Sequence, residues 1–249
     1  SLFNIVSFAL YATTEHIPFK GYKCVGEEYH DKQIVTNALK TLKPLDSDDD
    51  VLSSDTASEN ILANMTEYTY IKLESLGISD RVLLELSNEL LKKIDEESIK
   101  SVVINLAGNN VTSDGIHILM KLLSHEKVKF FNIVDNYEIS GKNIKIVCST
   151  FYSILSSSPE YREQGDEKIK ERIRLLTQKL IFIRKDYINT SSRRVMIYKD
   201  LVEKGYLDTN WAQIHKDYYQ EMLSIKEDDF GDLNYLSDFD LTDRATDLK

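Results

Sequence analysis

The fold is decided by the stretch SVVINLAGNNVTSDGIHILMKLL, which runs from Ser101 to Leu123. Its first part is rich in β-branched and apolar residues and predicts a strand over 102–106. A turn of Asn, Thr, Ser, Asp and Gly follows, and the apolar residues of 116–123 then recur at the spacing of an amphipathic helix. This stretch therefore predicts a strand, a turn and a helix in immediate succession.

The same succession recurs on either side of this stretch. On the N-terminal side, residues 71–73 predict a strand and 82–94 an amphipathic helix; on the C-terminal side, 130–134 predict a strand and 144–155 a helix. Strands and helices that alternate at this density indicate parallel strands, because each crossover helix returns the chain to the same edge of the sheet. We therefore expect an α/β fold.

Aligned at their strands, these units form an internal repeat. Apolar residues occupy alternate strand positions, Asn109 and Asn136 follow the second and third strands, and Gly115 precedes the second helix. The predicted units start at residues 68, 101, 128 and 178, so their spacing is irregular. In the fourth and most degenerate unit, Ile181 and Ile183 are expected to take the core positions of the strand.

This pattern resembles the leucine-rich repeat family in its longer, ribonuclease-inhibitor-like form, and the segment NLAGNNVTSDGIHILMKLL (105–123) resembles a typical unit. The resemblance covers residues 66–150 and extends less clearly to about 205. It implies a short α/β solenoid with a parallel sheet, helices on one face and a helical C-terminal cap. It also implies structural roles for Asn109 and Asn136, whose amides satisfy backbone groups at the turn, and for Gly115, which lets the helix lie close to its neighbour.

In that family the outward strand positions line a concave binding face, so the resemblance implies a partner-binding surface on the sheet. The residues at these positions are Lys72, Glu74, Val103, Asn105, Phe130 and Asn132. Phe130 is the most informative, being a large apolar side chain expected to face outward. If so, Phe130→Asp abolishes partner binding and leaves the fold intact, whereas a one-residue slip in register would exchange these positions with the core.

A second resemblance, to the STAS domain of anti-sigma-factor antagonists, gives an alternative for residues 101–123. It implies a regulatory domain in which Ser113, in the turn Thr112–Gly115, is phosphorylated. The turn is one residue shorter than the STAS pattern, Asn109–Asn110 replaces its apolar pair, and the third unit has no counterpart there. A different α/β fold is the remaining alternative.

Charge and composition divide the 249-residue chain into four parts. We expect an N-terminal α/β or helical cap (1–43), an acidic flexible linker (44–60), the repeat-like domain with its C-terminal helical cap (61–225) and an acidic-hydrophobic tail (226–249). The net charge of the chain is −10, and the linker and tail together carry −11. The remaining part of the chain is therefore nearly neutral. Within it, residues 162–199 hold eleven bases against five acids, which indicates a solvated helix face, an acceptor for the acidic tail or, least of all, a nucleic-acid surface.

The C-terminal region contains two amphipathic elements. An apolar stripe between Trp211 and Met222 predicts a helix that caps the open end of the solenoid. The tail interleaves large apolar residues with acids, so it either docks on this protein or folds against a partner. We expect its ordered contacts at Phe230, Tyr235, Leu236 and Phe239.

No catalytic, nucleotide-binding or metal-binding motif is present in the sequence, so we expect no enzyme activity, no cofactor and no metal. Two Cys residues cannot form a disulfide framework, and the longest apolar run is too short to cross a bilayer. We therefore expect a soluble cytoplasmic protein that binds another protein as an interaction module or scaffold. The alternatives are a structural subunit of a larger assembly and the switch at Ser113.

Overall fold

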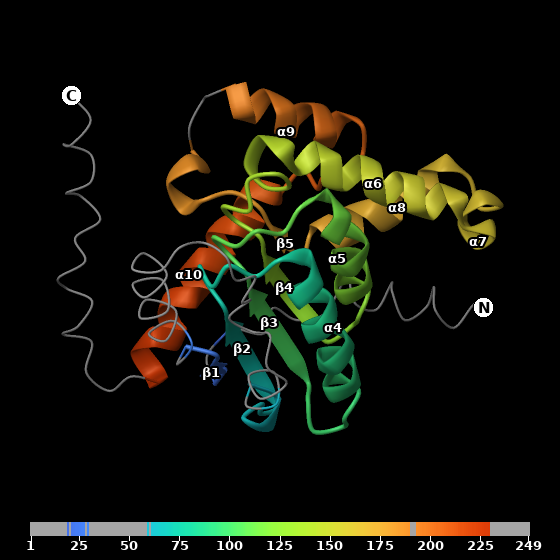
Figure 1. The fold of residues 1–249 in the computed structure, drawn as a ribbon. Helices are drawn as coiled ribbons and strands as arrows, with labels where there is room; N and C mark the ends of the chain where they lie inside the picture. The colour runs from blue at the N-terminus through green and yellow to red at the C-terminus, as the bar shows by residue number, and fades with distance from the viewer. Residues whose placement is uncertain are drawn as a thin grey trace, which may run out of the picture.

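The computed structural model describes residues 61–189 and 193–229, together with residues 19, 21–27, 29 and 59. Their five strands form one sheet in the order β1-β2-β3-β4-β5, and every neighbouring pair is parallel. The chain thus adds each strand beside the previous one (Figure 1). The strands are β1 (Lys23–Val25), β2 (Tyr68–Lys72), β3 (Ser101–Asn105), β4 (Val128–Asn132) and β5 (Leu180–Ile181).

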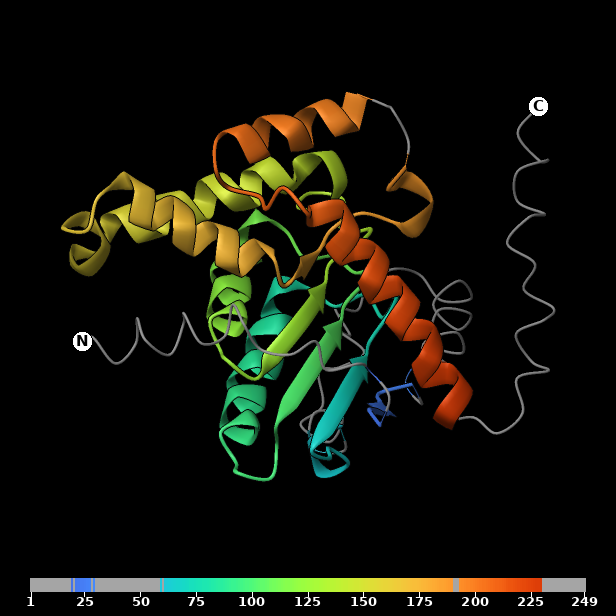
Figure 2. The ribbon, with the colours of Figure 1, turned by 180° about the vertical axis from the view of Figure 1, so that it is seen from behind.

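Helices lie on both faces of this sheet. One face is covered by α4 (Asp80–Ile94), α5 (Ile116–Leu123), α6 (Ile144–Ser157) and α8 (Asp166–Thr177), while α10 (Trp211–Asp229) crosses the other face (Figures 1 and 2). The remaining helical segments are α7 (Pro159–Arg162), α9 (Arg193–Glu203), η1 (Ser113–Gly115), η2 (Gly141–Asn143) and η3 (Lys185–Tyr187). The predicted parallel α/β fold is confirmed, but the expectation of helices on one face only is wrong.

Local sequence explains where α4 begins and ends. Ser79 is extended and its side chain accepts a hydrogen bond from the backbone N–H of Val82, which satisfies one of the donors left open at a helix start. Asp80 in the first turn and Lys92 and Lys93 in the last turn complement the helix dipole. These features lie at the limits that periodicity alone predicted.

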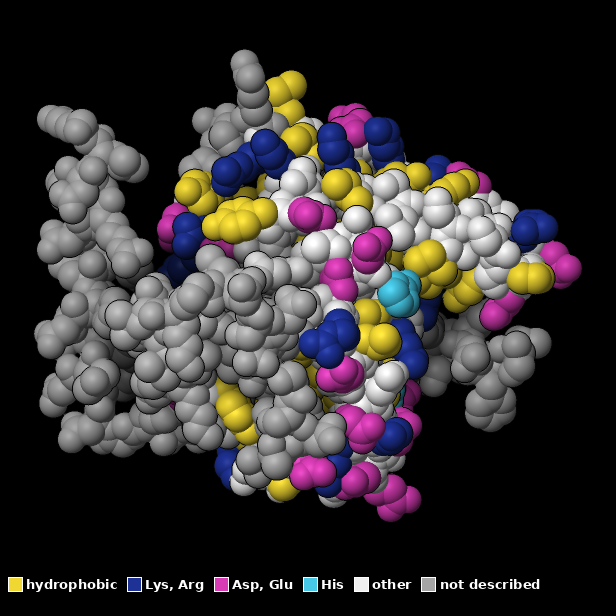
Figure 3. All heavy atoms as spheres, viewed as in Figure 1, with side chains coloured by type: hydrophobic (Ala, Val, Ile, Leu, Met, Phe, Trp, Pro, Cys, Tyr) yellow, Lys and Arg dark blue, Asp and Glu magenta, His cyan; other side chains and the backbone are white. Residues whose placement is uncertain are grey.

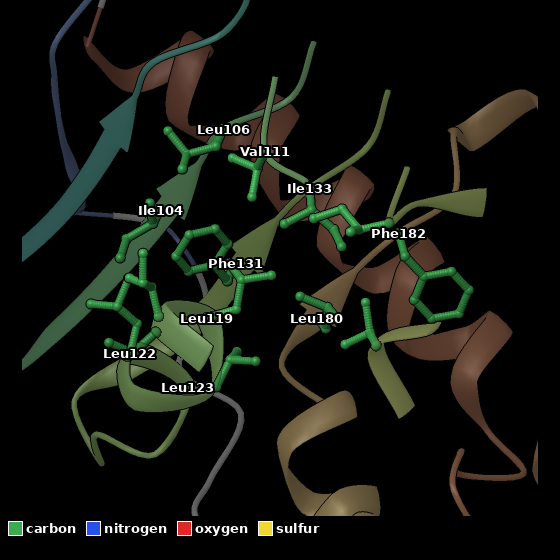
Figure 4. Packing of buried hydrophobic residues seen from close by; sticks show 14 of the residues in the cluster. Ile104, Leu106, Val111, Leu119, Leu122, Leu123, Phe131, Ile133, Leu180 and Phe182 are labelled. Carbon is green, nitrogen blue, oxygen red and sulfur yellow. The ribbon is translucent and has the colours of Figure 1, made fainter. Parts of the chain in front are cut away.

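The main core fills the space between the sheet and α4, α5, α6 and α8. In Figure 4, Ile104 and Leu106 from the β3 region and Phe131 from β4 lie toward Leu119 and Leu122 of α5. All five side chains are almost fully buried. Burying an apolar side chain of this size contributes about 1.5–3 kcal/mol to stability, so the inward strand positions account for much of the folding energy.

The fourth repeat unit differs from the prediction by one residue. Leu180 pairs with Phe131, and Ile181 pairs with Asn132. Leu180 and Phe182 therefore point into the main core, while Ile181 faces α10. Ile183, beyond the end of β5, is buried in the main core as predicted. The predicted register placed Ile181 in the main core; because side chains alternate along a strand, a one-residue shift moved it to the other face.

The N-terminal part of the chain contributes the edge strand β1 to the same sheet, through pairing of Lys23–Val25 with Thr69–Ile71. Most of the predicted N-terminal cap (1–43) and nearly all of the acidic linker (44–60) lie outside the described residues. No helix within the described part of the chain is both long and apolar enough to cross a membrane.

The sequence predicted that the helix beginning at Trp211 caps the open end of a solenoid, but most of α10 lies elsewhere. Its first turn packs at the β5 end, where Trp211 lies 4.8 Å from Tyr198 and 5.9 Å from Phe182 between ring centroids. The helix then continues toward β1, and Tyr218 and Ile225 are buried in a second apolar cluster on that face of the sheet (Figure 2). Its apolar residues thus bury a face, because its 19 residues are long enough to cross several strands.

Candidate functional site

The predicted partner-binding positions lie on the sheet face opposite α4, α5 and α6, but they are not exposed. Val103, Asn105 and Asn132 are buried, and Phe130 keeps only 9% of its surface accessible. Lys72 and Glu74 are half-buried at the edge of this group. The expectation of an open concave face is therefore wrong, because α10 covers this face of the sheet. Whether these six residues bind a partner stays a prediction that requires α10 to move away.

Aromatic rings pack at the contact between α10 and the sheet. Phe130 lies between Tyr218 of α10, at 5.5 Å, and Phe19, at 6.0 Å between ring centroids. The Lys129 ammonium lies 5.0 Å from the Phe19 ring and forms an ion pair with Glu221 of α10 at 3.6 Å. Edge-to-face aromatic pairs stabilise such contacts beyond their buried area, so α10 is firmly packed.

A hydrogen-bonded polar network lies under α10, around Asn105 and Asn132. The Asn105 amide donates to the Tyr70 hydroxyl at 2.6 Å and to Glu74, while the Asn132 amide donates to the Tyr218 hydroxyl at 3.3 Å. Burial raises the pKa of both Tyr70 and Tyr218, so both hydroxyls stay protonated. The network gives hydrogen-bond partners to polar groups that α10 removes from water, so it stabilises the packing of α10 on the sheet.

The asparagines predicted to have structural roles form a ladder at the ends of the strands. Asn109 accepts hydrogen bonds from the N–H groups of Leu76 and Ile78 and donates to the carbonyl groups of Leu73 and Leu106. Asn136 makes the equivalent hydrogen bonds in the next unit. It accepts from Val111 and donates to Leu106 and Ile133. Each amide thus joins the turn of its own unit to the unit before it.

Three positions before this turn share a left-handed backbone. Ser75, Gly108 and Asp135 have φ of 55°, 70° and 59°, and the strand register makes them equivalent. Such values are uncommon for residues other than Gly, so the repeat fixes a backbone shape that its side chains do not prefer. Gly115 has a different role, because a Cβ there would lie less than 3.0 Å from the Asp80 carboxylate that binds Thr112.

The other predicted functional residues are Ser113 and the four tail residues. Ser113 is exposed at the first position of η1. The tail residues Phe230, Tyr235, Leu236 and Phe239 lie outside the described residues. Within the described residues, no group of three or more His, Cys, Asp or Glu side chains could hold a metal ion. Of the positions singled out for binding, those that the structure describes thus do not converge on one exposed site.

His215 lies on α10 and is the only buried histidine among the residues that the structure describes. Its contacts define its protonation state. Its Nε2 accepts a hydrogen bond from the Phe182 N–H at 3.1 Å, so the proton is assigned to Nδ1, which lies 2.9 Å from the Trp211 carbonyl. Burial lowers the pKa of His215 from 6.5 to about 4. The neutral ring therefore supports the join between β5 and α10.

Acid is expected to destabilise the protein through this histidine. Between pH 6.5 and about 4 the unfolded chain holds a proton on His215 that the folded chain lacks, so stability is lost as pH falls through this window. From pH 7.5 to 5 we expect His215 alone to reduce the free energy of unfolding by about 2 kcal/mol. Denaturant unfolding of wild type and His215→Gln at both pH values measures this difference. His117→Gln, at an exposed histidine, should leave the pH dependence of wild type unchanged.

An exposed pocket lies where β4 and β5 end and is here called the strand-end pocket. It has a volume of about 270 Å³ and is formed by the segments that follow the two strands, the start of η2 and the first turn of α9. Its charged and aromatic lining residues are Asp135, Tyr137, Lys142, Phe182, Arg184, Tyr187 and Arg194. In parallel α/β sheets the carboxyl ends of the strands are the usual place for ligands.

Cationic and aromatic groups dominate the strand-end pocket. Three cations stand against one acid, Asp135, whose carboxylate lies 3.0 Å from the Arg184 Nε. The Arg194 guanidinium lies 4.6 Å from the centroid of the Tyr187 ring, and Tyr137 is 83% exposed. Basic side chains gather over α9 along the top of the molecule in Figure 3, with hydrophobic side chains between them. This arrangement suits an anionic group.

Sequence reasoning did not identify this pocket. Two of its cations, Arg184 and Arg194, belong to the basic stretch 162–199, which was the available signal. Lys142 comes from another repeat unit, and only the pairing of β4 with β5 brings the two segments together.

Comparison of the chain with protein-family models, with curated proteins and with solved structures finds no match.

Proposed function

We propose that this protein is a non-enzymatic protein–protein interaction module and that it contacts an acidic partner through the strand-end pocket. The observation that carries the proposal is the grouping of Lys142, Arg184 and Arg194 with the exposed Tyr137 around an open hollow. Tyr and Arg are the side chains most enriched at the energetic centres of protein interfaces. A cationic surface also speeds association with an acidic partner.

We further propose that the fold is a short leucine-rich-repeat-like solenoid. The sequential parallel strand order, the asparagine ladder of Asn109 and Asn136, and the left-handed residues at equivalent positions support this proposal. The partner would then bind at the strand ends and not on the sheet face, because α10 covers that face. A contribution from the acidic tail, a role in a larger assembly and a switch at Ser113 remain predictions.

Reversing two pocket charges is expected to abolish partner capture. We would compare wild type with Lys142→Glu/Arg194→Glu by affinity capture from cells that make the protein, followed by quantitative mass spectrometry. The control, Lys121→Glu/Arg162→Glu, makes the same change of charge at exposed positions on α5 and α7.

We expect one or more acidic proteins to be retained by wild type and the control and reduced about tenfold or more with the pocket variant. Close charge pairs across an interface couple by about 1.5–7 kcal/mol, and about 1.4 kcal/mol is a tenfold change in affinity. Equal retention by all three proteins would contradict the proposal. A thermal unfolding curve for each variant shows that the fold is intact.

A further inference from the structure

We propose that the strand-end pocket receives a phosphate monoester carried by a side chain of the protein partner. This inference rests on the proposed function and specifies the chemistry that the pocket recognises. It follows from the charge of the lining, the size of the hollow and the arrangement of its arginines.

The charge of the pocket matches that of a phosphate monoester. Lys142, Arg184 and Arg194 contribute three positive charges and Asp135 one negative charge, so the lining carries a net +2. A phosphorylated Ser, Thr or Tyr carries about −1.5 to −2 at pH 7 and offers three acceptor oxygens. A single carboxylate carries half that charge and two oxygens, so it would leave part of the cationic lining uncompensated.

The two arginines offer the donors that phosphate prefers. The 3.0 Å contact between Arg184 and Asp135 is made by Nε, and a guanidinium carries further N–H donors on its two terminal nitrogens. Arg194 is stacked on Tyr187, which restricts its planar fork before a ligand arrives. Arginine binds phosphate oxygens with paired N–H donors, and a restricted guanidinium loses less freedom on binding.

The size of the hollow favours one phosphorylated side chain over a free nucleotide. Its volume of about 270 Å³ is at or below the lower limit of sites for drug-sized ligands, about 300–1,000 Å³. Tyr137, at 83% exposure, gives the rim a large aromatic side chain that is mostly accessible. Such a residue can contact the peptide around the phosphorylated side chain, so the pocket suits a phosphate presented by a protein.

The direct test uses phenyl phosphate as the probe and phenyl sulfate, which carries a single charge, as its control. Isothermal titration and amide NMR shifts of the full chain at pH 7.5 give the affinity and the location. We expect phenyl phosphate to bind about tenfold or more tightly than phenyl sulfate, with shifts centred on Gly141–Asn143 and Arg184. Arg184→Gln and Arg194→Gln should each weaken it at least fivefold, and Arg162→Gln should have no effect. Equal binding of the two probes, or no effect of the pocket variants, would overturn the phosphate assignment.

Phosphatase treatment of the extract separates this inference from the proposed function. We expect it to abolish capture by wild type. Capture could survive phosphatase treatment and still be lost with Lys142→Glu/Arg194→Glu. That result supports the proposed interaction but overturns the assignment of a phosphate, and the pocket then binds acidic side chains of the partner. If capture does not depend on the pocket, the assignment of the phosphate to a protein partner is overturned even where phenyl phosphate binds.

Discussion

Asn109→Ala is expected to lower the free energy of unfolding by about 3–5 kcal/mol, because a single buried amide satisfies backbone groups of two repeat units. The substitution leaves the N–H groups of Leu76 and Ile78 and the carbonyl groups of Leu73 and Leu106 without this partner inside the protein. Chemical denaturation followed by circular dichroism measures the change.

The neighbouring Asn110 supplies the matched control. Its side chain is exposed, and only its backbone N–H joins the ladder, by donating to the Ile78 carbonyl. Asn110→Ala should therefore change stability by less than about 0.5 kcal/mol, as is usual for exposed positions. Similar losses for the two variants would show that the turn, and not the asparagine ladder, is sensitive to substitution.

Phe130→Asp is expected to destabilise the protein by about 4 kcal/mol or more, in contrast to the outcome that sequence reasoning predicts. The ring is packed between Phe19 and Tyr218, so the substitution leaves a cavity and places a carboxylate in an apolar cluster. Because domains are typically stable by 5–15 kcal/mol, this loss removes a large part of the free energy of unfolding. Denaturant unfolding, with Phe130→Leu as a milder variant, measures the effect.

Tyr137→Asp is the control for this second prediction. It places the same charge at an aromatic residue that is 83% exposed, and we expect a stability change within about 0.5 kcal/mol. A folded Phe130→Asp variant that loses less than 1 kcal/mol would mean that α10 does not close the sheet face. The open concave surface would then be available after all.

The helices and strands that depend on local sequence could be predicted, and their alternation along the chain predicted that the strands of the sheet are parallel. The stretch around Ile104 and Leu106 is rich in β-branched and apolar residues, and α4 has both an apolar stripe and a capping serine. The degenerate fourth unit had no such signal. β5 is two residues long, and the neighbouring apolar run from Leu180 to Ile183 fits either register equally well. Only its pairing with Phe131 and Asn132 decides between them.

The position of α10 could not be predicted, because it depends on contacts far apart in sequence. Its periodicity showed an apolar stripe but not which surface that stripe covers. Tyr218 contacts Phe130 on β4, and Met222 lies 3.6 Å from the Tyr70 hydroxyl on β2. The outward-facing Val103 and Phe130 were clues, since large apolar residues on a sheet face indicate that something covers it.

The strand-end pocket was hidden for a similar reason. Lys142 and Arg194 are separated by more than fifty residues, and neither belongs to a recognisable motif. They meet because the repeat places the ends of β4 and β5 side by side. Charge counting along the chain detected the basic stretch but could not show that part of it lines a hollow.

Hydrogen–deuterium exchange of the protein with and without its captured partner tests the site most directly. The account predicts added protection in 134–143 and 184–187, which form the strand-end pocket, with no change in the strands β2, β3 and β4 under α10. Protection confined to the α10 helix and these strands, or faster exchange in α10 as it is displaced, would contradict the account and place the partner on the sheet face.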